Sequence, residues 1–239
     1  SFINKKLMIR NSNTSSEDLR ISIPNISASN LGISISESNQ VSQVSTPQKV
    51  GSEFQVNSYT AGDQNGTIIP PQSVAALSNG DFVISWNSAG QDGSDAGIYA
   101  QIFSSNGTKK GSEFLVNSIT ENNQLHPTVS AFDDGGFIIG FMSYGQDGDS
   151  AGHTNSYAQR FDSAGNRVGE QFILTDNTAG YQHHPVVTAL SDGKFVATWQ
   201  ANATNQYKIY SKIFDSNNNP LSAEFMVNTS TSGMQHHAD

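Results

Sequence analysis

The chain has 239 residues, of which 35% are hydrophobic and 14% are charged, and its formal net charge is -9. Because only 12 lysines and arginines are spread along it, it lacks the basic surface that a phosphate backbone requires, and no nucleic acid is expected as a partner. Cysteine is absent, which excludes disulfide bonds, thiolate metal sites and a cysteine nucleophile. No apolar run reaches the roughly 18 residues of a membrane-spanning helix, so membrane insertion is not expected.

Residues 1–48 are rich in serine and asparagine and form an extended leader outside the repeats described below. Residues 19–23 and 31–35 alternate apolar and polar side chains, which predicts one or two half-buried strands. Such strands need a sheet to pair with. The leader is therefore expected to add to a sheet edge of another copy of the chain and so to drive self-assembly.

Residues 49–239 contain a repeat of about 55 residues, a length typical of propellers, solenoids and tandem arrays. Its most regular part is a Glu-Phe strand that occurs four times, as GSEFQVN at 51–57, GSEFLVN at 111–117, GEQFILT at 169–175 and SAEFMVN at 222–228. Three repeats are complete and a fourth begins.

Each repeat is predicted to hold four antiparallel strands. The first strand ends at Leu77, Phe132 or Leu190 and is followed by an Asn-Gly or Asp-Gly pair, which predicts a two-residue hairpin turn. The period of two in the second strand places large apolar side chains on one face, which is expected to be buried. These side chains are Phe82, Trp86, Phe137, Phe141, Phe195 and Trp199.

The third strands are expected over 98–103, 156–161 and 209–214, and a second turn then leads into the Glu-Phe strand. Four short strands in a meander, repeated at this spacing, predict an all-β fold that is a β-propeller-like array of four-stranded antiparallel repeats. Propellers usually close with four or more such units. The segment 235–237 repeats the Gln-His-His of 182–184, so a further repeat is expected beyond Asp239.

The strings GSEFQVN, VAALSNGDFVISW, GQDGSDAGIYAQIF and FDSAGNRVG resemble a tandem repeat of large secreted bacterial surface proteins, the type I secreted adhesins and RTX haemolysin-like proteins. The resemblance covers residues 49–239. It implies export and an extracellular or cell-surface location. The glycine-rich nonapeptide of RTX domains is missing, so the resemblance does not itself imply calcium.

Two loops between the second and third strands suggest a metal. Residues 90–97 place Asp92 near Asp95, and residues 145–152 place Asp147 near Asp149. Closely spaced carboxylates among glycines supply the hard oxygen ligands that calcium prefers, so calcium is expected at both loops. The alternative is a solvated turn. The third copy of the loop, 200–206, has no carboxylate and is expected to be free of metal.

Histidines recur at one register ahead of the first strand, at His126, His184 and His237. Equivalent positions of a propeller ring its axis, so these imidazoles could converge on a zinc ion or an anionic ligand, although exposed loop histidines are the commoner case. Tyr144 and Tyr181, together with Tyr207, are candidates for stacking on sugars.

The acidic residue of the Glu-Phe strand recurs as Glu53, Glu113 and Glu224, with Gln171 in the remaining copy. One carboxylate per repeat does not form the pair that glycoside hydrolysis needs, so hydrogen bonding at a strand start is expected instead.

Together these features predict a non-catalytic extracellular adhesion or scaffold module that binds other copies of itself or cell-surface glycans. The alternatives are a carbohydrate-binding propeller lectin and a fibre or surface-layer subunit that assembles through leader strands. An enzyme ranks behind these, because the sequence contains no recognisable nucleophile elbow, phosphate loop or metalloprotease motif.

Overall fold

The computed structural model describes residues 52–65, 73–146, 152–202, 206–230, 233 and 235, and the structural statements below refer to these residues. The chain divides into a unit of Ser1–Ser52 and a unit of Glu53–Asp239, and the second unit contains all the described elements. The predicted leader with its strands, and the pairing of those strands with another copy, lies outside the described residues.

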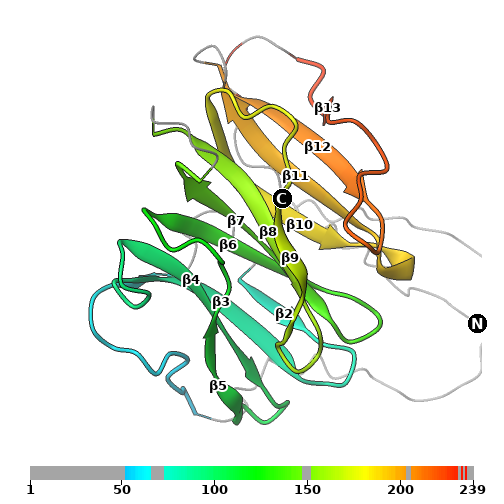
Figure 1. Ribbon diagram of the computed structural model, residues 1–239. Helices are drawn as coiled ribbons and strands as arrows, with labels where there is room; N and C mark the ends of the chain where they lie inside the picture. Colours follow the sequence, from blue (N-terminus) through cyan, green and yellow to red (C-terminus); the bar gives the residue numbers. More distant parts are fainter. Residues whose placement is uncertain are drawn as a thin grey trace, which may run out of the picture. The chain divides into compact units, whose positions relative to one another are not determined.

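The fold is all-β and consists of three antiparallel sheets, each built from one repeat (Figure 1). The first sheet contains β1 (Gln64–Asn65), β2 (Val74–Ala76), β3 (Phe82–Ala89), β4 (Ala96–Phe103) and β5 (Lys109–Leu115). The second contains β6 (Gln124–Ala131), β7 (Phe137–Tyr144), β8 (Thr154–Phe161) and β9 (Arg167–Ile173). The third contains β10 (Tyr181–Ala189), β11 (Phe195–Asn202), β12 (Lys208–Phe214) and β13 (Phe225–Met226). This confirms the prediction of a propeller-like array of four-stranded meanders, with β1 and β2 together in the place of a single first strand.

The hairpin turns after the first strands differ from the prediction. Leu77 N–H donates to the carbonyl of Asp81 over 2.8 Å, and Gly80 N–H donates to the carbonyl of Leu77 over 3.0 Å. Three residues therefore lie in the loop, with Gly80 at φ 85° in its last position. This is a three-residue hairpin loop, in which a turn is followed by one left-handed residue, and the predicted two-residue turn is wrong. In the third sheet, the 3₁₀ turn Ser191–Gly193 takes this place.

The large apolar side chains of the second strands are buried as expected. Phe137, Phe141 and Phe195 are fully buried, Trp199 is 1% exposed and Trp86 is 5% exposed. Phe82, by contrast, is only partly buried. In the second sheet the opposite face is covered as well, since Ile138 on that face is fully buried. Strand β7 can be apolar on both faces because the second sheet is packed between the first and the third.

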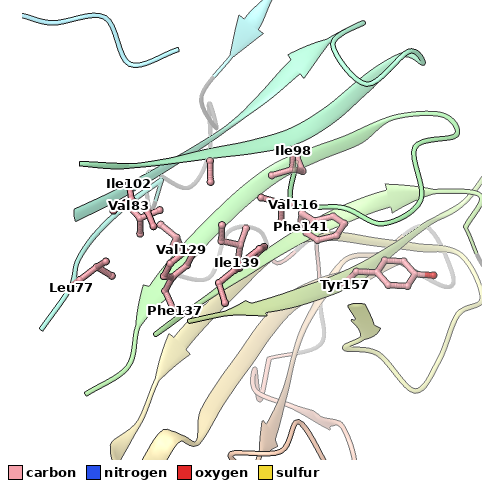
Figure 2. Close-up of a cluster of buried hydrophobic side chains, with 12 residues drawn as sticks. Leu77, Val83, Ile98, Ile102, Val116, Val129, Phe137, Ile139, Phe141 and Tyr157 are labelled. Atoms are coloured by element: carbon pink, nitrogen blue, oxygen red, sulfur yellow. The ribbon is translucent and has the colours of Figure 1, made fainter. Parts of the chain in front are cut away.

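Two hydrophobic clusters hold the three sheets together. The first lies between the first and second sheets and is shown in Figure 2. It includes Leu77, Val83, Ile98, Val116, Val129, Phe137, Ile139 and Phe141. The second cluster joins the second and third sheets and includes Phe132, Leu174, Val187, Phe195 and Trp199. Each sheet is thus stabilised mainly by burying apolar area against the next, as in repeat proteins.

The acidic residue of the Glu-Phe strand forms a clamp between repeats. The carboxylate of Glu113 accepts hydrogen bonds from the backbone N–H groups of Ser58 at 2.5 Å and Tyr59 at 3.0 Å, in the segment that follows the preceding Glu-Phe motif. Gln171 accepts from Ser118 N–H at 2.8 Å in the same way, and Glu224 accepts from Asp176 N–H at 2.9 Å. The structural role expected for these residues is therefore observed. No helix formed by the described residues is long and apolar enough to cross a membrane.

Candidate functional site

The first predicted calcium loop connects β3 to β4. Asp92 accepts the backbone N–H of Ser94 through Oδ1 at 3.2 Å, and Asp95 accepts the side-chain amide of Asn123 at 3.5 Å. Among the described residues, no group of three or more histidine, aspartate or glutamate side chains is arranged to hold a metal ion. The geometry of this loop therefore gives calcium no support. The second loop, with Asp147 and Asp149, lies outside the described residues.

The histidines and tyrosines gather in one place instead. We use the name histidine–tyrosine cluster for the ring systems of His126, His153, Tyr181, His183, His184 and Tyr207. The rings of Tyr181 and His183 are stacked, with centroids 5.3 Å apart and planes 8° apart. His153 meets Tyr181 edge-on at 5.0 Å, and Tyr207 lies 5.8 Å from His183. Segments from two sheets thus contribute to one aromatic surface.

Two β-bulges position the central pair of rings, His126 and His184. The ladder between β6 and β7 shifts register between Leu125 and Thr128, and the ladder between β10 and β11 shifts between His183 and Val186. Each shift places one extra residue on the first strand of its sheet.

A proline follows the histidine at each bulge, where its missing N–H removes no ladder hydrogen bond. Both histidines have positive φ, 56° for His126 and 50° for His184. Their rings consequently turn towards each other, with centroids 4.3 Å apart and planes 60° apart.

This arrangement costs free energy. A non-glycine residue in the left-handed region is strained, and here the strain occurs twice at the same position of the repeat. The Nδ1 atom of His126 is buried and has no hydrogen-bond partner among the described residues. Burying an unpaired polar atom is unfavourable, so stability alone does not account for the bulged histidines. Strain and orphaned polar atoms concentrate at functional sites, and this makes the cluster the candidate site.

Two imidazoles of the cluster, those of His126 and His183, have a lowered pKa and are uncharged at neutral pH. Burial, together with the neighbouring His184, lowers the pKa of His183 from 6.5 to about 4. Burial also lowers the pKa of His126, with a smaller contribution from His183. A neutral imidazole has one N–H donor and one acceptor nitrogen. The cluster can therefore form hydrogen bonds in both directions with an uncharged polar ligand.

A cavity lies close to the cluster at the same end of the second sheet. It has a volume of about 410 Å³ and is lined by residues 118–122 and by Tyr144, Gly145 and Gln146. Tyr144 is the ladder partner of Thr154, whose hydroxyl lies 3.5 Å from Nδ1 of His183. The cavity and the cluster are thus linked through one pair of strand residues.

A larger cavity of about 510 Å³ lies among the hairpin turns at the opposite end of the sheets. Four aspartates and Arg160 line this cavity. The hydrogen bonds of Asp162 and Arg160 stabilise the hairpin turns. Asp162 accepts the side-chain amide of Asn166 and the backbone N–H groups of Ala164 and Asn166. These bonds lower the pKa of Asp162, and the bond from the Asn166 side chain has the largest effect. The Arg160 guanidinium donates to two backbone carbonyls of the third sheet. This cavity is therefore the weaker candidate for a ligand site.

The sequence alone identified part of the cluster. The shared register of His126 and His184 was read correctly, and Tyr181 and Tyr207 lie beside them as sugar-stacking candidates. His237 lies outside the described residues. The contributions of His153 and Thr154 were missed, because no repeated motif marks them and their contacts with Tyr181 and His183 join two different sheets. Arg160 was also missed, although it is the only arginine at its position in the three repeats.

No family model matches the chain, and no curated protein matches it. Among solved structures, it is similar to a thermostable family-43 glycoside hydrolase, with 14% identity over 66% of this chain and 54% of that one and a TM-score of 0.44. It is also similar to the GH43 endo-arabinanase from Bacillus licheniformis, with 17% identity over 67% of this chain and 61% of that one and a TM-score of 0.43. The alpha-L-arabinofuranosidase from Lactobacillus brevis is similar with 16% identity over 63% of this chain and 52% of that one and a TM-score of 0.41. The chain spans between 52% and 61% of the length of these three proteins.

These findings correct the predicted function. The three similar structures are named as a glycoside hydrolase, an arabinofuranosidase and an endo-arabinanase, and none is named as an adhesion or scaffold module, a lectin or a fibre subunit, so the predicted non-catalytic function is not kept. The exclusion of an enzyme is withdrawn for the same reason. Interaction with glycans is compatible with these similarities, whereas self-association and calcium binding gain no support from them. The resemblance to surface-protein repeats and the extracellular location stay predictions.

Proposed function

We propose that the protein is active on carbohydrates and that the histidine–tyrosine cluster binds the sugar. The observation that carries the proposal is the stacked pair of Tyr181 and His183, in which the tyrosine is 37% exposed. An exposed ring that is held by a second ring beneath it offers a rigid apolar surface. The C–H face of a pyranose or furanose ring packs on such a surface at little entropic cost.

The chemistry around the stacked pair suits the hydroxyl groups of a sugar. The imidazoles of His126 and His183, whose pKa values are lowered, provide donors and acceptors that carry no charge near pH 7. Sugar sites combine apolar stacking with a few well-placed polar groups, as small-molecule sites generally do. The cavity beside Tyr144 would accept further units of an oligosaccharide.

The test is calorimetric titration of the full chain with neutral oligosaccharides. Arabino-oligosaccharides are the first choice, because two of the similar structures are named for an activity on arabinan or arabinofuranosides. We expect saturable binding, with the affinity reduced at least about tenfold in Tyr181→Ala because one aromatic contact surface is lost. Release of reducing ends from arabinan, measured in parallel, tests whether binding leads to cleavage.

Phe225→Ala provides the matched control, because Phe225 is an aromatic residue with a similar exposed fraction, 45%, on a different strand. This variant should bind sugar like the unaltered chain. Lack of saturable binding across a panel of neutral oligosaccharides, or equal affinities of Tyr181→Ala and the unaltered chain, would overturn the proposal.

A further inference from the structure

Corresponding positions in the three repeats differ in burial in a regular way. Val116 of the first repeat and Leu174 of the second are fully buried, whereas the equivalent Val227 of the third is 51% exposed. The residues that end the first strands show the same change. Leu77 is 4% exposed and Phe132 is 2% exposed, but Leu190 is 40% exposed.

In the first two repeats, side chains of the next sheet bury these positions. Val116 and Leu77 belong to the hydrophobic cluster that contains Val129, Phe137 and Ile139 of the second sheet. Leu174 and Phe132 belong to the cluster that contains side chains of β10 and β11 in the third sheet. In both cases the first two strands of the next sheet bury the position. We use the name open face for the uncovered equivalents, Leu190, Phe225 and Val227.

The phenylalanine of the Glu-Phe strand shows what the open face lacks. This ring packs against the phenylalanine that ends the third strand of the following sheet. The ring centroids are 5.3 Å apart for Phe54 and Phe103, 5.3 Å for Phe114 and Phe161, and 6.0 Å for Phe172 and Phe214. Phe225 is the fourth member of this series, and its side chain is 45% exposed.

The path of the chain after β13 agrees with this series. Gln235 N–H donates to the carbonyl of Tyr207 over 3.0 Å, at the start of β12. In the first repeat, Asn123 forms a parallel bridge with Ala96 at the start of β4, and the next residue, Gln124, begins the second sheet. The backbone at Gln235 therefore follows the route by which the chain passes from one sheet to the next.

We propose that the open face binds a fourth four-stranded sheet of this same repeat, which continues the polypeptide from Gln235. Its first two strands would cover Leu190 and Val227, and the phenylalanine of its third strand would pack on Phe225. Its fourth strand would supply a glutamate or glutamine that accepts the backbone N–H groups of 229–230, as Glu113 accepts those of Ser58 and Tyr59. This inference is independent of the proposed sugar site.

The absence of cysteine allows a direct test by thiol labelling. Single cysteines are introduced by Val227→Cys and Leu190→Cys. Each variant is prepared as the 239-residue chain and as a chain extended after Asp239 by a copy of residues 187–230, which completes the repeat in register. Maleimide labelling should be fast in the 239-residue chain and at least about tenfold slower in the extended chain, because labelling follows exposure.

Two control variants give the labelling rates of a buried and of an exposed cysteine. Leu174→Cys should label slowly in both chains, because the third sheet already covers it, and Ser163→Cys in an exposed turn should label rapidly in both. Equal rates for Val227→Cys in the two chains would overturn the proposal. Slow labelling of Val227→Cys in the 239-residue chain would also overturn it. If that protection is independent of protein concentration, residues already present cover the face, and if it grows with concentration, a second copy does.

Discussion

His126 and His184 hold the same position in neighbouring repeats, and the centroids of their imidazole rings lie 4.3 Å apart. Both residues belong to a bulge at which the first strand of a sheet carries one extra residue, and both have positive φ. The contact is therefore produced by the backbone, which turns each ring out of the normal alternation of its strand. A regular strand would not present these two rings to each other.

Protonation of His183 should destabilise the fold. Its pKa is lowered from 6.5 to about 4, so between these values the unfolded chain binds more protons than the folded chain, and stability falls as pH falls. The full loss below pH 4 is at most about 3 kcal/mol, and less because the ring is partly solvated. Urea unfolding between pH 7.5 and 4.5 measures the slope. His183→Gln should flatten it, whereas an unchanged slope would contradict the role of this ring.

Removing the Glu113 clamp should loosen the segment that precedes the first sheet. Glu113→Ala deletes the acceptor of two backbone N–H groups and of the Gln91 amide, and we expect a loss of about 1 to 2 kcal/mol in the free energy of unfolding. Glu113→Gln should cost less, because Gln171 performs this role in the next repeat. Equal losses for both variants in urea melts would show that charge, and not the acceptor oxygen, matters.

Arg160 should be important for the contact between the second and third sheets. Its guanidinium is buried, donates to the carbonyls of Ser216 and Gly193, and lies 3.9 Å from the centroid of the Phe132 ring. Arg160→Ala leaves these carbonyls unpaired and opens a cavity, so we expect a loss of about 2 to 4 kcal/mol in chemical unfolding.

Arg160→Ile is the informative companion variant, because the first repeat carries Ile102 at this position. It should retain more stability than Arg160→Ala, since it fills part of the space. If Arg160→Ile proved as costly as Arg160→Ala, the hydrogen bonds to the turns would outweigh the packing of the side-chain stem.

Truncating Trp199 should be among the most damaging single changes. The side chain is 1% exposed within the cluster between the second and third sheets, so Trp199→Ala should cost about 3 to 5 kcal/mol. Val168→Ala is the control, because Val168 is 44% exposed, and it should cost less than about 1 kcal/mol. Similar urea midpoints for the two variants would mean that Trp199 is not a core residue.

The strands, their order within a sheet and most of the core could be predicted from the amino-acid sequence. These features follow from local signals, namely the period of two in 82–86 and its copies and the glycines at the turns. Both act within a few residues and recur in every repeat. The same reasoning misjudged the turn length at Gly80, because two- and three-residue loops use the same Asn-Gly chemistry and only the hydrogen bonds of Leu77 distinguish them.

The contacts between side chains of different sheets became known only from the folded structure. The contact of His153 with Tyr181, the clamp of Glu113 on Ser58 and the donation of Arg160 to the third sheet join residues far apart in sequence. The packing of one sheet on the next creates these contacts, and no local pattern encodes that packing. For the same reason Val116 and Val227 have the same sequence setting but opposite burial, because the burial of a strand residue depends on what covers its sheet.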